Sequence, residues 1–200
     1  MRGFNKCVKL PIPLVFTLAL VVFLPAGRAE QKDTQQVRIL TSFEGKAGEP
    51  EWQAVNDGVM GGLSKGGPAI KDGSLHFSGT LSLENNGGFS SVRAMELKQD
   101  FTGKPQMVMR VKGDGRTYQL RLSTDALYQG SRIAYGGSFA TEDGKWIEVR
   151  VPFESLAPSW RGKKLDGPPL DLSKIREISI MIADKKPGPF VIEVDWIGVG

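Results

Sequence analysis

The sequence has little of the chemistry on which metal sites and most catalytic sites depend. It contains one cysteine and one histidine in 200 residues. Cys7 lies near the N-terminus, so the rest of the chain offers no disulfide and no thiolate. His76 lies between Leu75 and Phe77, and strand alternation turns it away from their face. These shortages argue against a zinc site and against catalysis by histidine or cysteine.

Motifs of common enzymes are missing as well. The chain has no Gly-x-Ser-x-Gly nucleophile elbow, and no Gly-Lys-Ser/Thr follows its glycine pairs to form a phosphate loop. The alternation Glu193-x-Asp195 resembles an acidic strand of some jelly-roll glycosidases, but Gly198 stands where a further glutamate would follow. We therefore expect no enzymatic activity, no catalytic residue and no cofactor.

No apolar run is long enough to predict a permanent membrane span, which needs about 20 residues. The run over residues 10–24 is shorter and contains prolines, with basic residues before it and the small residues Gly27 and Ala29 after it. This order predicts a secretory signal peptide over residues 1–29, cleaved after Ala29. We expect an exported protein, periplasmic or secreted, with no stable membrane span after cleavage.

The mature chain lacks a net charge. The chain has 26 Lys and Arg against 22 Asp and Glu, and the excess equals the basic residues of the leader, which are Arg2, Lys6, Lys9 and Arg28. A neutral chain has little electrostatic attraction for a phosphate backbone. We therefore expect no nucleic-acid partner.

Alternating apolar residues are what the sequence does have. Met107, Met109 and Val111 occupy every second position, the period that places side chains on one face of a strand. Turn pairs such as Asp72-Gly73 separate these runs, and apart from one short turn of helix at 173–175 no helical spacing is convincing. After a flexible N-terminal tail at 30–36, one all-β domain over 37–200 is expected. The expected strands are 37–43, 74–83, 89–97, 106–112, 118–123, 132–139, 146–151, 175–182 and 190–199.

Two segments rich in glycine, asparagine and aspartate carry a more specific pattern. The first signature segment, residues 52–64, is WQAVNDGVMGGLS, and the second, residues 83–93, is LENNGGFSSVR. Together they resemble the complex I intermediate-associated protein 30 family. Later matches are GDGRxY at 113–118 and IEVDWI at 192–197, so the resemblance extends over about 43–199.

The resemblance implies a single jelly-roll β-sandwich similar to galactose-binding domains, which agrees with the sandwich or barrel that the strand pattern predicts. It also implies a role in assisting the assembly of other proteins, known best for mitochondrial respiratory complex I. It supplies no catalytic residues.

The signature segments have two interpretations. They form either two rigid loops packed together, with Met60 and Phe89 closing the end of the sandwich, or a surface that binds a partner. In the first case we expect Asp57 and Arg93 to pair across the contact. In the second, tryptophan and arginine would anchor the interface. The candidate binding residues are Trp52, Asn56, Asp57, Met60, Asn86, Phe89 and Arg93.

The leading functional hypothesis is a protein-binding assembly or chaperone-like factor for an envelope or membrane complex, with no identified partner. The alternative is a carbohydrate-binding jelly roll of the periplasm or extracellular space. A structural calcium at Glu44 and Asp195 is a minor hypothesis, because two carboxylates supply few of the six to eight oxygens that calcium takes. The aromatic residues that would stack on sugar rings are Trp52, Tyr128, Tyr135 and Trp160.

Overall fold

The computed structural model describes Met1 and residues 36–200. The predicted signal peptide beyond Met1 and nearly all of the predicted tail lie outside the described residues. Within them the chain forms thirteen strands and four short 3-10 helices, with no α-helix. The strands are β1 (Arg38–Thr41), β2 (Trp52–Asn56), β3 (Lys65–Lys71), β4 (Ser74–Leu81), β5 (Ser90–Ala94), β6 (Gln106–Lys112), β7 (Thr117–Tyr128), β8 (Ser131–Ala140), β9 (Trp146–Pro152), β10 (Ala157–Trp160), β11 (Lys163–Lys164), β12 (Glu177–Ile182) and β13 (Gly188–Val199). The 3-10 helices are η1 (Asp57–Met60), η2 (Glu84–Asn86), η3 (Phe153–Ser155) and η4 (Leu172–Lys174).

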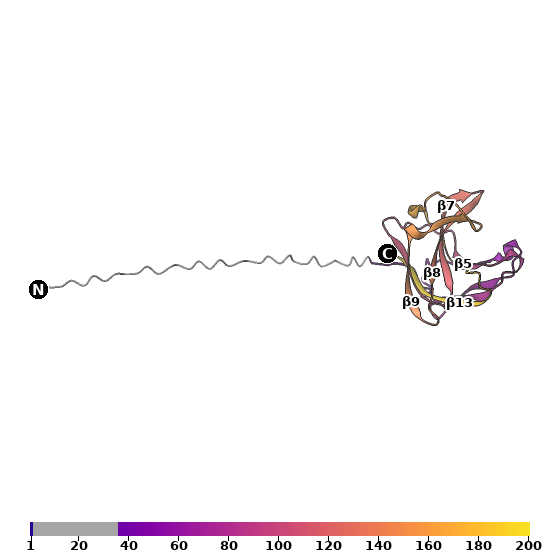
Figure 1. Ribbon diagram of the computed structural model, residues 1–200, viewed down its shortest axis with the longest axis horizontal. Helices are drawn as coiled ribbons and strands as arrows, with labels where there is room; N and C mark the ends of the chain where they lie inside the picture. Colours follow the sequence, from indigo (N-terminus) through magenta and orange to yellow (C-terminus); the bar gives the residue numbers. More distant parts are fainter. Residues whose placement is uncertain (2–35) are drawn as a thin grey trace. The chain divides into compact units, whose positions relative to one another are not determined.

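The strands form two sheets, here called sheet A and sheet B (Figure 1). Sheet A has the order β3-β4-β13-β6-β9, with β1 also paired to β13. Sheet B has the order β11-β10-β8-β7-β12-β5-β2, so β12 lies between strands that precede it in the chain. Neighbouring strands are antiparallel, as in β12 with β5 and β12 with β7. The architecture confirms the all-β jelly-roll sandwich that the sequence predicted.

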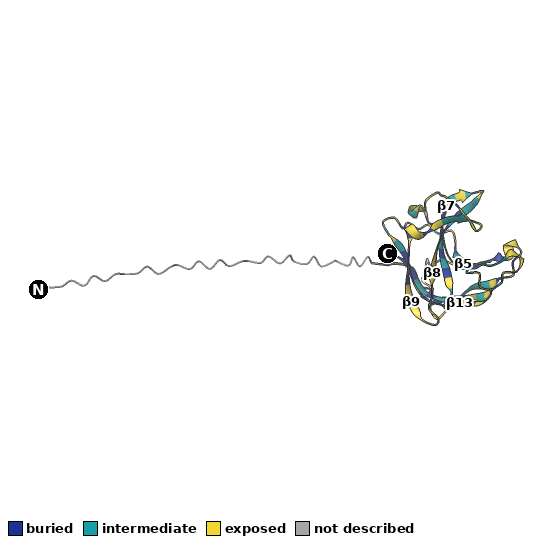
Figure 2. Cartoon of the chain, viewed as in Figure 1, coloured by how far each residue is buried: buried dark blue, intermediate teal, exposed yellow. Residues whose placement is uncertain are grey.

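The core lies between the sheets and is built from alternating positions of the strands (Figure 2). From sheet A, Met107 and Met109 point inward and are fully buried. From sheet B, Val92, Leu120 and Ile180 do the same, and the register places these three in one row across β5, β12 and β7. Each fully buried aliphatic side chain contributes about 1.5–3 kcal/mol through removal from water.

Four strands fall in regions where the sequence predicted no strand. β2 lies inside the first signature segment. β3 contains Gly66, Gly67 and Pro68 and runs along the edge of sheet A, where a proline costs no hydrogen bond within the sheet. β10 and β11 form a short hairpin between the expected strands 146–151 and 175–182. The predicted helical turn near 173–175 is present as η4, where the Asp171 carboxylate accepts a bond from the Ser173 amide.

Two glycines let β3 lie close to its neighbours. A side chain at Gly79 on β4 would overlap the backbone of Lys65, and one at Gly66 on β3 would overlap the side chains of Ser90 and Phe190. The edge of sheet A can therefore approach β5 of sheet B. The chain between β2 and β3, which contains η1, is held at this end of the sandwich.

Candidate functional site

The two signature segments meet at Asp57, the first residue of η1, whose side chain is fully buried. Its carboxylate accepts hydrogen bonds from the Ser64 amide at 2.9 Å and the Ser64 hydroxyl at 2.5 Å. From the second segment, the amides of Gly88 and Phe89 donate to it at 2.7 and 3.3 Å. Burial alone would raise the pKa of Asp57, but the bonds from Ser64, Gly88 and Phe89 outweigh it and hold the pKa below its usual value. The charged Asp57 carboxylate therefore holds the two segments together through hydrogen bonds, a link here called the Asp57 staple.

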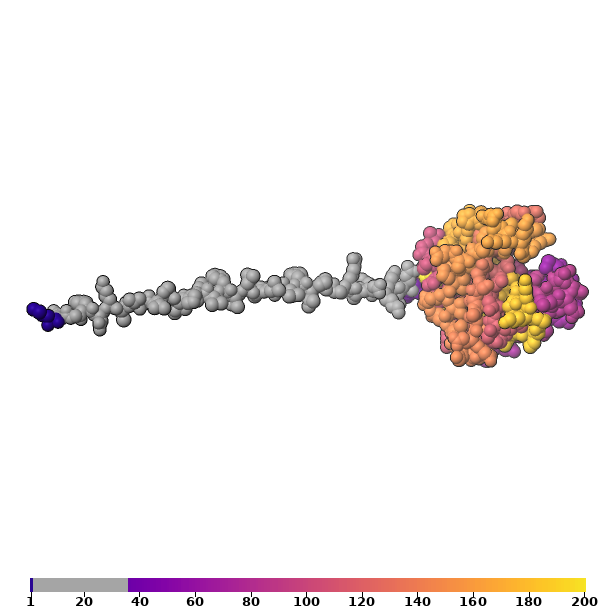
Figure 3. Space-filling view, viewed as in Figure 1, coloured from indigo at the N-terminus to yellow at the C-terminus, as the bar shows by residue number. Residues whose placement is uncertain are grey.

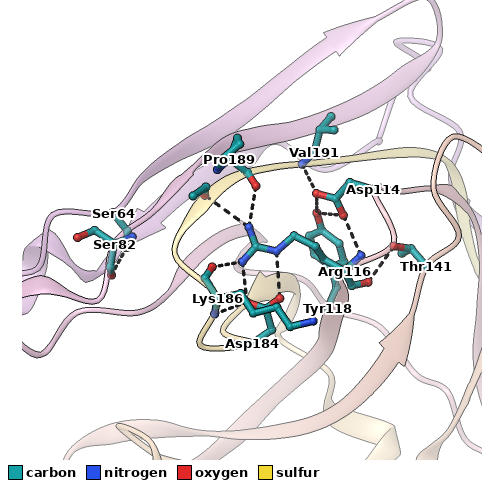
Figure 4. A network of polar contacts seen from close by, with 11 residues as sticks. Ser64, Ser82, Asp114, Arg116, Tyr118, Thr141, Asp184, Lys186, Pro189 and Val191 are labelled. Carbon is teal, nitrogen blue, oxygen red and sulfur yellow. Dashed lines mark hydrogen bonds and ion pairs between the residues drawn. The ribbon is translucent and has the colours of Figure 1, made fainter.

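Two glycines leave space for the Asp57 carboxylate. A Cβ at Gly62 would overlap the Asp57 carboxyl group, and a Cβ at Gly87 would lie 2.6 Å from Asp57 Oδ2. The Ser64 hydroxyl also accepts a bond from the Ser82 amide at 3.0 Å (Figure 4). Packing around one buried anion thus accounts for Gly62 and Gly87, where no side chain would fit.

Of the other predicted site residues, Asn56 and Trp52 are also engaged inside the fold, and Asn86 is not. The Asn56 side chain donates to the Gly66 carbonyl at 3.0 Å and accepts from the Ser90 hydroxyl at 2.5 Å, which ties β2 to both β3 and β5. The ring of Trp52 lies 5.9 Å from that of Phe43 and packs against the core. Asn86 is exposed.

The structure changes two details of the expected packing. The predicted pairing of Asp57 with Arg93 is wrong: Arg93 makes its ion pair with Glu177 at 3.5 Å. Hydroxyl and amide donors already satisfy the Asp57 carboxylate, whereas Arg93 projects from the outer face of β5, opposite to the buried Val92. Met60 does not close the sandwich, because its side chain is 58% exposed. The expectation that the two segments meet is confirmed.

A groove with a volume of about 640 Å³ crosses the outer face of sheet B. Figure 3 shows the surface hollowed between the purple lobe, which contains the first signature segment, and the orange-to-gold lobe opposite. One wall carries Val59, Met60 and Leu83, and the other carries Trp160 and Arg161. Of the predicted site residues, Met60, Phe89 and Arg93 line this groove, and Trp52, Asn56, Asp57 and Asn86 do not.

The floor of the groove is formed by the centre of sheet B. β12 is buried along its whole length although only one of its faces meets the core. On its outer face Glu177, Ser179 and Met181 are 8%, 2% and 7% exposed. Side chains of the neighbouring strands therefore cover most of this face, and of these three residues only Met181 lines the groove.

A second polar network surrounds Arg116 and lies outside the groove (Figure 4). Its guanidinium binds both oxygens of Asp184, at 3.0 and 2.6 Å, and donates to the carbonyls of Lys186, Gly188 and Pro189. Asp114 accepts from the Tyr118 hydroxyl at 3.1 Å and from the Val191 amide at 2.8 Å. Burial, followed by the nearby charge of Asp114, raises the pKa of Tyr118. The GDGRxY match at 113–118 thus ties β7 to the turn before β13.

Of the aromatic residues named for the carbohydrate alternative, Tyr128 and Trp160 are in contact, with their rings edge-on at 5.3 Å. Tyr135 is fully buried, with its hydroxyl 3.4 Å from the Pro169 carbonyl, and the ring of Trp160 is covered by Arg161 at 4.9 Å. Glu44 pairs with Lys46 and Asp195 with Arg110, each at 2.5 Å. Within the described part of the chain, no group of three or more His, Cys, Asp or Glu side chains could hold a metal ion.

Comparison with known proteins finds a family that matches most of this chain. The model of the family described as Complex I intermediate-associated protein 30 matches residues 41–194. The mouse protein "Complex I intermediate-associated protein 30, mitochondrial" is 29% identical over 88% of this chain and 60% of its own length. The Drosophila melanogaster protein of the same name is 26% identical over 64% of this chain and 45% of its own. The chain thus spans about half the length of the curated relatives that it matches.

Among solved structures, the family 11 carbohydrate-binding module of a cellulosomal cellulase of Clostridium thermocellum superposes with a TM-score of 0.62. The two are 19% identical, and the match covers 82% of this chain and 95% of the module. At this identity the likeness shows the jelly-roll fold alone.

The expected periplasmic or secreted location is wrong, because the curated relatives are named as mitochondrial proteins. That expectation rested only on the order of basic, apolar and small residues in the leader, most of which lies outside the described residues. The cysteine-free domain itself carries no mark of an oxidising compartment. Among residues 36–200 we find no helical segment that could span a bilayer.

Proposed function

Because the chain belongs to the complex I intermediate-associated protein 30 family, we propose that its domain is a non-catalytic protein-binding module that assists the assembly of a membrane complex of the complex I type. The groove on the outer face of sheet B is its docking surface. The family consists of complex I assembly factors, which supports a protein as the partner.

The observation that carries this proposal is the exposed aliphatic wall of the groove. Val59, Met60 and Leu83 are 76%, 58% and 42% exposed, and they line one side of the same groove. Adjacent apolar side chains at a recessed surface are typical of interfaces, because association removes them from water. Both signature segments contribute to this wall.

The wall is rigid because of the buried Asp57 staple. η1, which carries Val59 and Met60, begins at Asp57, and Leu83 lies beside Ser82, whose amide donates to Ser64. A preorganised wall loses little conformational entropy on binding. The structural and functional interpretations of the signature segments are therefore compatible: polar residues inside hold apolar residues outside.

A native-gel assay of complex I in cells that lack this gene tests the proposal. We expect partly assembled complex I to accumulate, and the wild-type chain to restore the complete form. Met60→Glu places a charge on the groove wall and should fail to restore it at equal protein level. Ile39→Glu, at a 49% exposed position on β1 in the other sheet, is the matched control and should restore assembly. Normal complex I in cells without the chain would refute the proposal.

A further inference from the structure

Arg121 lies at the centre of the groove floor, on the outer face of β7. The register places Ser179 of β12 between Arg93 on β5 and Arg121 on β7, so the two arginines stand roughly 10 Å apart, at two strand spacings. The Arg121 guanidinium donates to the Ser159 hydroxyl at 3.2 Å and contacts Met181 Sδ at 3.7 Å. Both partners are neutral.

The charge of Arg121 is poorly compensated. Among the described residues, no carboxylate lies within ion-pair distance of Arg121, and Glu177 is engaged with Arg93. Burial, followed by the positive charge of Arg93, lowers the pKa of Arg121, with Glu177 offsetting part of the effect. An arginine stays protonated even so. A desolvated cation without an anionic partner is costly unless a ligand supplies one.

The other charged residues that line the groove are also positive. Its lining contains no aspartate or glutamate, and its cationic residues are Arg93, Arg121, Arg132, Arg161 and Lys185. Arg132 is paired with Glu96 at 2.8 Å outside this lining. The groove therefore combines an excess of positive charge on its floor and rim with the aliphatic wall of Val59, Met60 and Leu83.

We propose that Arg121 is the anchor for a carboxylate side chain in an acidic peptide segment of the partner protein, whose flanking apolar residues pack on the Val59–Met60–Leu83 wall. This inference rests on the proposed function and specifies which partner chemistry the groove selects. The planar guanidinium fork matches a carboxylate with two parallel hydrogen bonds. Arg93, two strands away, is already paired with Glu177, so Arg121 is the cation of the floor that lacks an anionic partner.

Other ligand classes fit this groove less well. A neutral oligosaccharide needs flat aromatic platforms, but Trp160 is already covered by Arg161 at 4.9 Å and meets Tyr128 edge-on at 5.3 Å. A lipid surface would meet the exposed cations Arg161 and Lys185 on the rim, but its headgroups would not reach Arg121 on the floor of the groove. A peptide side chain reaches a recessed cation while its backbone spans the walls.

Two peptide libraries test the inference. Each contains nine-residue peptides with Leu, Val and Phe around the centre; one has glutamate at the central position and the other glutamine. The wild-type domain should bind the glutamate library at least tenfold more tightly. Arg121→Met should reduce this preference to below twofold. Arg150→Met, which removes an exposed arginine paired with Glu148 on the other sheet, should leave it unchanged.

A second measurement uses only the wild-type domain, so its result does not depend on whether a variant folds. The Arg121 Nε–H resonance should shift on adding a glutamate peptide and not on adding its glutamine counterpart. Equal affinity for the two libraries, or an Arg121 resonance unaffected by glutamate peptides, would overturn the inference. Three competitors provide a further test: inorganic phosphate, phosphatidylglycerol vesicles and a β-1,3-1,4 glucan tetrasaccharide. The inference would also be overturned if any of them displaced the bound glutamate peptide at a concentration below that of the peptide.

The two proposals fail in different ways. If Arg121→Met restores complex I assembly as the wild type does while Met60→Glu does not, the docking surface stands and the carboxylate anchor is wrong. If glutamate peptides bind through Arg121 but cells without the chain assemble complex I normally, the anchor stands and the assembly role is wrong.

Discussion

The Asp57 carboxylate in the first signature segment accepts a 2.7 Å hydrogen bond from the Gly88 amide in the second. This bond joins residues that are 31 positions apart in the chain, and the Phe89 amide adds another at 3.3 Å. The charged side chain has no exposure to solvent. It therefore determines the shape of the end of the sandwich at which the groove wall stands.

Asp57→Asn should destabilise the domain. The amide cannot accept from every amide and hydroxyl donor that the carboxylate satisfies, and charged hydrogen bonds contribute about 1.5–3 kcal/mol each. We expect a loss of about 3 kcal/mol, or roughly 6–12 °C in Tm. Asp166→Asn, at an exposed position, is the control for a change of charge alone. Thermal melts that coincide for both variants would show that Asp57 is not a staple.

The same carboxylate predicts a pH dependence. The folded state holds the pKa of Asp57 below its usual value, so its contribution to stability is complete above the unfolded pKa of about 3.9. That contribution is lost as the pH falls through the lower, folded pKa. Chemical denaturation of the wild type between pH 6 and pH 2 should therefore lose more free energy of unfolding than the same series on Asp57→Asn. Parallel curves would contradict this.

Gly62 and Gly58 offer a matched pair. A Cβ at Gly62 would overlap the Asp57 carboxyl group, whereas a Cβ at Gly58 meets nothing within 4 Å. Gly62→Ala should cost about 1–3 kcal/mol, as overpacked sites do, and Gly58→Ala should be neutral. The measurement is the midpoint of urea unfolding. Equal midpoints would mean that the space beside Asp57 is not constrained.

Arg116 should stabilise the fold without contributing to binding. Its guanidinium makes a bidentate pair with Asp184, and the two side chains are only 12% and 7% exposed. Arg116→Met should cost about 3–5 kcal/mol, because it leaves Asp184 buried without its partner. Asp184→Asn combined with Arg116→Met should cost less than the sum of the single changes. Additive losses in calorimetry would show that the two side chains act independently.

The strands with alternating apolar residues were predictable from the sequence, because period two is a local property. β6 begins and ends where the alternation of Met107, Met109 and Val111 placed it. β3 was not predictable in this way, since Gly66 and Pro68 usually favour turns. They lie in a strand here because β3 runs along the edge of sheet A and Gly66 packs closely against Ser90.

The candidate site was predictable only in part. The signature segments indicated that the two loops meet, and the structure confirms it. The predicted partner of Asp57 was Arg93, whereas the carboxylate in fact accepts from the Gly88 and Phe89 amides. Alternation with Leu120 and Leu122 places Arg121 on the outer face of its strand, but which strands flank it depends on the sheet order. β12 reaches its place between β5 and β7 from far along the chain. Sequence reasoning therefore located one wall and Arg93 on the floor, and missed Arg121 and the opposite wall.

Site-specific photocrosslinking tests most directly whether the groove of sheet B docks a partner protein. A photoreactive amino acid at position 60 would stand on the groove wall, and one at position 191 would stand on sheet A as the control. After irradiation of membranes in which complex I is being assembled, mass spectrometry identifies the crosslinked proteins. The account predicts crosslinks from position 60 to a complex I subunit and none from position 191. Equal crosslinking from the two positions, or none from position 60, would contradict it.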